Sequence, residues 1–143
     1  MEEREIKDLL MRDMLRKRSK DIPRISSLLQ AAERNVRVAR SIPLNEDSAN
    51  IIFTAIYESL KQIGEAKWWA LGYESNSHEA TMRLLSESDI REKVKLKQLD
   101  RFRRIRNDAN YRGYRVIAAQ AKEILGLWES CGTELIALIR KEA

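Results

Sequence analysis

The chain has 143 residues, of which 43% are hydrophobic and 34% charged, and its formal net charge is +5. This composition excludes an intrinsically disordered chain and fits one folded domain over residues 1–143. The single cysteine excludes an internal disulfide, and no apolar run approaches the roughly 20 residues of a membrane-spanning helix. Because the N-terminus begins with acidic residues and lacks the layout of a secretory signal, we expect a cytoplasmic protein that does not enter the membrane.

Apolar residues at helical spacing run through most of the chain, and no alternating pattern typical of a strand interrupts them. A first helix is expected over residues 3–18. Its apolar stripe is narrow, so residues 1–20 would lie at the edge of the domain or at a subunit interface. A second helix begins at the capping signal Asp21 and runs to about Ser41.

Four further helices complete the expected fold. The longest is capped by Asn45, Asp47 or Ser48 and ends at Leu71, before Gly72. Ser77 can cap a short helix through residue 85, an arginine-rich helix follows residue 89, and the last runs over residues 116–140. The pattern predicts an all-α fold, an up-and-down bundle of four to five main helices with an extra N-terminal helix.

The arginine-rich stretch, LDRFRRIRNDANYRGY at residues 99–114, is the most distinctive part of the sequence. On a helix its apolar residues share one face that should pack, and the flank beside this face carries Arg103, Arg106 and Asn110 at i, i+3 and i+7. A guanidinium there would face a cleft, a phosphate or a partner's carboxylate, because its fork of N–H donors recognises such oxygens. On charge alone, a solvated basic helix held by carboxylates is the simpler interpretation.

Other candidate groups are few. His78 is the only histidine and follows the cap Ser77, which favours a structural role at a helix start over that of a catalytic base. Glu58 and Glu65 would face a polar cleft together, or pair with Lys61 on a wet surface. Since the sequence contains no paired Cys or His at metal spacing, no glycine-rich phosphate loop and no serine elbow, neither a metal nor a cofactor is expected.

The segment LDRFRRIRNDANY, residues 99–111, resembles the signature helix of the HEPN superfamily, small α-helical proteins of prokaryotes. The signature begins with an Arg-Asn pair, here Arg106 and Asn107. Two other segments agree with it in order and spacing: AIYESL at residues 55–60 resembles the family's long-helix AYEA pattern, and LGYESNSH at residues 71–78 resembles its connector with Gly-Tyr and then Ser-His.

The resemblance implies a HEPN-like bundle of four or five helices, frequently a homodimer whose signature helices face each other across a cleft. Many members are metal-independent ribonucleases, often toxins of toxin-antitoxin pairs. Others partner a minimal nucleotidyltransferase, or bind nucleotides or RNA without cleaving. In the nuclease branch four to six residues separate the arginine from a histidine, and here the position five after Arg106 is Tyr111. Some branches carry Arg-x-x-Ala-x-Tyr, which Arg106, Ala109 and Tyr111 match.

Three hypotheses follow. The first is a dimeric module that binds RNA, a nucleotide or a partner nucleotidyltransferase, with Arg106 and Tyr111 orienting an anionic ligand. The second is a metal-independent ribonuclease toxin in which Arg106 stabilises the developing charge and Tyr111 or His78 assists proton transfer. The third is an assembly module whose arginines only form ion pairs across a dimer interface. The further ligand-binding residues expected are Glu58, His78, Arg103, Asn107 and Asn110.

Overall fold

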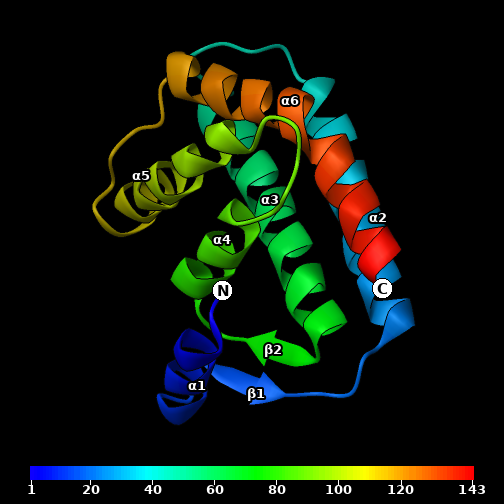
Figure 1. Ribbon diagram of the computed structural model, residues 1–143. Helices are drawn as coiled ribbons and strands as arrows, with labels where there is room; N and C mark the ends of the chain where they lie inside the picture. Colours follow the sequence, from blue (N-terminus) through cyan, green and yellow to red (C-terminus); the bar gives the residue numbers. More distant parts are fainter.

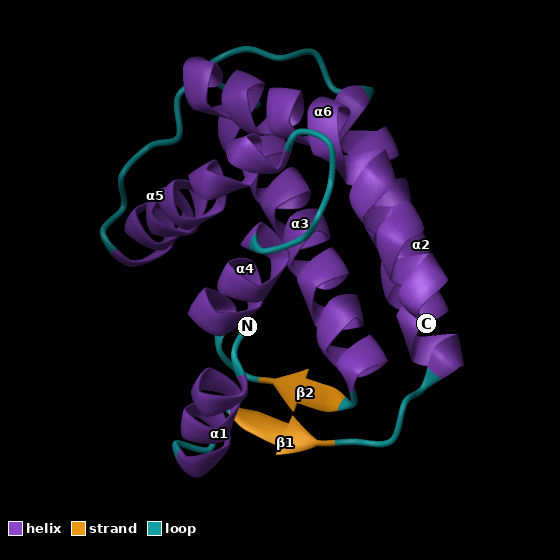
Figure 2. Ribbon diagram, viewed as in Figure 1, coloured by secondary structure: helices purple, strands orange, loops and turns teal.

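The computed structural model describes residues 1–143 and confirms the all-α prediction: six α-helices, one 3-10 helix and two short strands (Figures 1 and 2). No helix is both long and apolar enough to cross a membrane. The elements, in chain order, are α1 (Glu3–Met11), β1 (Leu15–Lys17), α2 (Ile22–Arg40), α3 (Ala49–Leu71), β2 (Tyr73–Ser75), α4 (His78–Ser86), η1 (Lys93–Gln98), α5 (Leu99–Tyr111) and α6 (Ala118–Glu142).

Helix α3 is the centre of the bundle, with α2, α4, α5 and α6 all packed against it. It is buried on most sides, as expected for a helix that is apolar over most of its circumference. Phe53 of α3 meets Phe102 of α5 edge to face at 5.9 Å between ring centroids. Residues of α2, α3, α5 and α6 join one hydrophobic core, which therefore fixes α5 relative to α3.

The prediction of a first helix over residues 3–18 is wrong. Helix α1 ends at Met11, because Asp13 takes a left-handed conformation with φ 56° and the Met14 N–H donates to the Leu9 carbonyl at 2.9 Å. The chain then forms β1, which pairs antiparallel with β2, Leu15 opposite Ser75. The expectation of no strand is therefore also wrong, since three residues are too short to display an alternating pattern.

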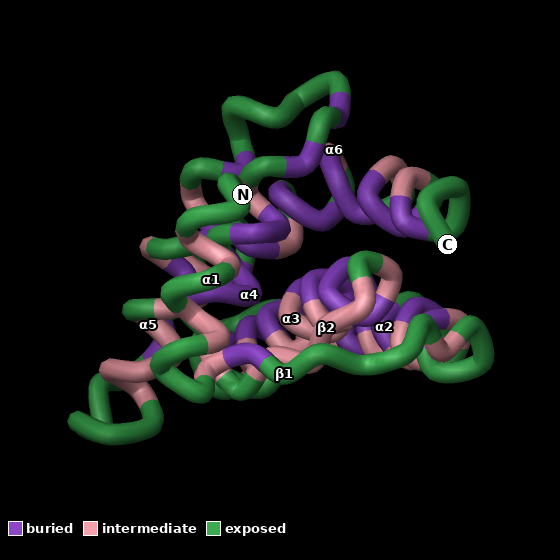
Figure 3. Tube along the Cα trace, turned by 60° about the horizontal axis from the view of Figure 1, so that its bottom comes forward, coloured by how far each residue is buried: buried purple, intermediate pink, exposed green.

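Helix α1 lies at one edge of the fold, and none of its residues is fully buried (Figure 3). Its apolar side chains rest on a small second cluster formed by Leu15, Trp68, Ala80 and Leu84. Leu15 is the strand residue in this cluster, so β1 extends the surface on which α1 packs.

Several helix ends agree with the sequence. Asp21 accepts from the Arg24 N–H at 3.0 Å, and the Ser77 hydroxyl accepts from the Ala80 N–H at 3.1 Å. Gly72 ends α3 with φ 90°, as the sequence predicts. The connection before α5 differs, because residues 93–98 form the 3-10 helix η1, and α6 begins at Ala118.

Candidate functional site

The first half of α5 is anchored in the core. Leu99 and Phe102 are its only fully buried residues, and they hold the helix against α3 and α4. This anchoring turns the polar flank of α5 towards α3. The guanidinium carbon of Arg106 lies 5.5 Å from the centroid of the Tyr57 ring, which belongs to α3. Arg106 is therefore not a solvated surface charge, in agreement with its place beside the apolar face.

Glu58 holds two cations at once. Its Oε1 accepts from Arg106 Nε at 3.0 Å and lies 2.9 Å from Arg106 Nη2, while its Oε2 lies 3.0 Å from Lys61 Nζ. The three side chains retain only 18%, 29% and 17% exposure for Arg106, Glu58 and Lys61. Partial burial alone would raise the pKa of Glu58, but the hydrogen bonds and positive charges of Lys61 and Arg106 outweigh it and hold this pKa below its ordinary value.

Arg103 lies on the same flank of α5 as Arg106 and adds a third cation beside Arg106 and Lys61. Its Nε and Nη2 donate to Asp100 Oδ1 at 3.1 and 2.9 Å, within the helix, and its side chain is 17% exposed. Asp100 also pairs with Arg104 at 3.3 Å on the outer side. As with Glu58, one carboxylate thus serves two cations.

Tyr57 lies beneath these charges. It is fully buried, and its hydroxyl has no hydrogen-bond partner. Burial raises the pKa of Tyr57 to about 12, against the opposing influence of the Arg106 charge. The phenol is therefore neutral at pH 7 and keeps its proton as an unused donor beside Arg106.

His78 approaches the same cluster from α4. It is the first residue of that helix, directly after the cap Ser77, and it is largely exposed. Partial burial lowers the pKa of His78, and the nearby positive charge of Lys61 lowers it further, opposed by Glu58. The imidazole is therefore predominantly neutral at pH 7, in the form that accepts a proton.

The structure does not bring every residue expected from the sequence into this cluster. Tyr111 is 83% exposed, on a different side of α5 from Arg106, because five residues correspond to about 140° of rotation beyond one full turn. Asn110 is exposed, and Asn107 is half-buried. Of the residues expected from the sequence, the cluster therefore contains Arg106, Glu58, Arg103 and, at its edge, His78.

Two members of the cluster were missed as site residues from the sequence. Tyr57 reads as an ordinary core residue, and Lys61 as a surface partner of the neighbouring carboxylates. The available signal was the spacing on one helix, where a core tyrosine, a carboxylate and a lysine follow each other as Tyr57, Glu58 and Lys61. Long-range contact with Arg106, 48 residues away, gives these residues their role, and no local pattern reveals it.

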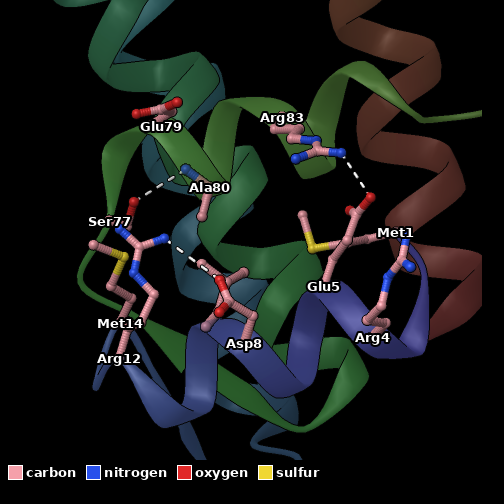
Figure 4. A pocket seen from close by; sticks show the side chains of 11 residues that line it. Met1, Arg4, Glu5, Asp8, Arg12, Met14, Ser77, Glu79, Ala80 and Arg83 are labelled. Atoms are coloured by element: carbon pink, nitrogen blue, oxygen red, sulfur yellow. Dashed lines mark hydrogen bonds and ion pairs between the residues drawn. The ribbon is translucent and has the colours of Figure 1, made fainter.

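A separate hollow of about 470 Å³ lies between α1 and α4 (Figure 4). Its main charges are already paired across or along the walls: Arg83 with Glu5 at 2.7 Å, and Arg12 with Asp8 at 3.4 Å. The first pair joins α1 to α4, and the second stays at the end of α1. The hollow therefore belongs to the contact between these two helices and is separate from the cluster around Arg106.

The cluster is suited to anions more than to metals. No group of three or more His, Cys, Asp or Glu side chains is arranged to hold a metal ion.

Comparison of the chain with models of protein families, with curated proteins and with solved structures finds no match.

Proposed function

We propose that this protein is a HEPN-like module that binds RNA or a nucleotide through phosphate, at the junction of α3, α4 and α5. The observation that carries the proposal is that Arg106 and Lys61, both largely buried, share the single carboxylate of Glu58. One positive charge at this point is therefore not balanced by its nearest partner. Glu65 lies 4.0 Å from Lys61 Nζ, farther than the 3.0 Å of Glu58, and burial raises the pKa of Glu65.

The chemistry of the cluster fits a phosphate group. Glu58 engages Nε and Nη2 of Arg106, so the remaining guanidinium N–H donors are free for the oxygens of a ligand. Partial exclusion of water strengthens such contacts relative to those of exposed arginines.

The resemblance to the HEPN superfamily adds the expected assembly. It supports a homodimer in which the α5 helices face each other across the binding cleft. It also supports a minimal nucleotidyltransferase as a partner protein, in a toxin-antitoxin-like context.

The test is binding of a fluorescently labelled RNA oligonucleotide, followed by anisotropy at 50 and 200 mM salt. The wild-type protein is expected to bind, with affinity falling steeply as salt rises. Lys61→Met and Arg106→Met should each weaken binding about tenfold, in line with the loss of one charge-assisted contact. Arg40→Met is the matched control, because Arg40 is an exposed arginine of α2 paired with Glu129.

Two outcomes would contradict the proposal. One is no binding at 50 mM salt by a protein whose circular dichroism and urea unfolding show the native fold. The other is an equal loss of affinity in the Arg40→Met control. Lys61→Met keeps the test decisive if Arg106→Met fails to fold, because the ion pair of Lys61 with Glu58 lies within α3 and does not join two helices.

The alternative function is a metal-independent ribonuclease. One observation favours His78 over Tyr111 as its base: the pKa of His78 is lowered by burial and by Lys61, whereas Tyr111 lies exposed on another side of α5. This alternative predicts RNA cleavage in the presence of EDTA that His78→Gln abolishes and Tyr111→Phe leaves unchanged. Absence of cleavage by the folded wild-type protein would eliminate it.

A further inference from the structure

Two tyrosines at the end of α5 have their rings in water. Tyr111 is 83% exposed and Tyr114 is 60% exposed. Figure 3 shows the end of α5 and the loop after it as a continuous exposed stretch, and residues 110–115 are all exposed. Aromatic rings of this size usually bury most of their surface. Their exposure here raises the question of what covers them.

The loop that carries the tyrosines has a defined conformation. Gly113 takes φ 71°, and the Tyr114 N–H donates to the Asp108 carbonyl at 3.3 Å, while the Arg112 N–H donates to the same oxygen at 3.0 Å. The Asp108 carbonyl thus closes the helix end by accepting from N–H groups four and six residues later, with Gly113 in the left-handed conformation common after helix ends. Tyr111 and Tyr114 are therefore held on either side of a fixed turn.

The far end of the loop is fixed as well. Arg115 Nη2 donates to the Glu46 carbonyl at 2.9 Å and lies 3.3 Å from Asp47 Oδ1, both in the connection between α2 and α3. The next residue, Val116, is 2% exposed and belongs to the core. Since the chain is tied down on both sides, the exposure of Tyr114 belongs to the fold and is not the consequence of a loose loop.

The surroundings of the tyrosines are basic. Arg112 is 69% exposed and reaches Asp108 only at 3.9 Å, and Arg104 is 66% exposed. A second copy of the chain related by a two-fold axis would bring the same patch against itself, arginines facing arginines. A polyanion meets no such repulsion. Charge complementarity therefore favours a polyanion with flat, unpaired groups.

We propose that residues 111–115 form a stacking platform for a single-stranded RNA, with unpaired bases lying on the rings of Tyr111 and Tyr114 and the adjacent arginines contacting phosphates. This inference rests on the proposed function and extends it. The five residues from Arg106 to Tyr111 span about 7.5 Å along the helix, at 1.5 Å each. Because Arg106 and Tyr111 also lie about 140° apart around α5, a strand that reaches both the phosphate site and the platform passes around the helix and extends over more than two stacked nucleotides at 3.4 Å each.

The experiment compares three labelled probes of equal length by anisotropy: a single-stranded 12-nucleotide RNA, the same RNA as a duplex, and an abasic strand with the same phosphates. The single strand should bind at least tenfold more tightly than either of the others, because only it offers unpaired bases. The variant Tyr111→Ala/Tyr114→Ala should lose about tenfold on the single strand and nothing on the abasic strand. Tyr111→Phe/Tyr114→Phe is the matched control and should retain wild-type affinity, because it keeps both rings.

The outcomes separate this inference from the proposed function. If the abasic strand binds as tightly as the RNA, the platform is refuted and the phosphate site stands. If no probe binds at low salt, the proposed function fails together with the platform. If the alanine variant leaves RNA affinity unchanged but lowers the molar mass measured by light scattering, the tyrosines belong to an interface between copies. Both tyrosines are exposed, so the variants are expected to fold, and urea unfolding checks this.

Discussion

Replacing Glu58 by Gln tests whether the carboxylate shared by Arg106 and Lys61 organises the site. Glutamine keeps the size of the side chain, but it has one acceptor oxygen where glutamate has two, and its amide group faces a cation. Its oxygen can serve Arg106 at the 3.0 Å position or Lys61 at the 3.0 Å position, not both. One charge-assisted contact is therefore lost between groups that are mostly buried.

The expected destabilisation of Glu58→Gln is about 1–2 kcal/mol. Hydrogen bonds to charged groups contribute about 1.5–3 kcal/mol, and the remaining exposure of these side chains reduces that figure. Glu129→Gln is the matched control, because Glu129 pairs with Arg40 at 3.4 Å while both are more than half exposed. Exposed pairs contribute roughly 0–1 kcal/mol, so this control should lie near zero. Urea unfolding at pH 7 gives both free energies.

The pH dependence provides the decisive check. The pKa of Glu58 is lowered in the folded protein from its ordinary value of 4.5. Its stabilising contribution is therefore fully present above that ordinary value and is lost as the pH falls through the lowered folded pKa. The difference between wild type and Glu58→Gln should shrink below pH 4.5. The reasoning is refuted if Glu58→Gln and Glu129→Gln differ by less than 0.5 kcal/mol, a threshold of about the size of an exposed pair, or if the difference persists in acid.

Three further variants test packing and burial elsewhere in the bundle. At Gly64 an added Cβ would lie 2.6 Å from Thr81 Cγ2. Gly64→Ala should therefore destabilise the protein by about 1–3 kcal/mol through overpacking, despite the better helix propensity of alanine. At Gly126 an added Cβ meets nothing within 4 Å, so Gly126→Ala should stabilise the protein by up to about 1 kcal/mol in urea unfolding. Burial lowers the pKa of Lys67 from 10.5, so the unfolded chain holds more protons just below that pH and wild-type stability should rise there with pH. Lys67→Met should remove this rise; an unchanged alkaline profile would contradict the argument.

The fold was largely predictable because most helices carry their own signals. The side chains of Asp21 and Ser77 cap the starts of α2 and α4 by accepting hydrogen bonds from nearby N–H groups. Gly72 ends α3 in the left-handed conformation that glycine adopts readily. The strands carried no such signal. Leu15 is held in β1 by pairing with Ser75, 60 residues away, and a three-residue strand leaves no periodicity to detect.

The site was predictable only in part. Arg106 was identified because the border of an apolar face is a local property of one helix. For its partner Glu58 the sequence left two alternatives, a polar cleft or a surface pair with Lys61. The contact with Arg106 joins helices far apart in the chain, so no local pattern predicts it. Tyr111 was grouped with Arg106 by spacing in a motif, whereas helical rotation turns the two side chains to different sides of α5.

Helix α5 also limits which ligands can use the whole of the proposed surface. Its first half is fixed by Phe102 against Phe53, and its end by the turn at Gly113 and the tether of Arg115, so the distance from Arg106 to the tyrosines does not adapt to a ligand. A mononucleotide is too short to join sites on different sides of the helix and would occupy the phosphate site alone. Truncation of the platform should therefore weaken RNA and leave mononucleotide binding intact. The geometry of one rigid helix thus favours a strand over a nucleotide as the ligand of the complete surface.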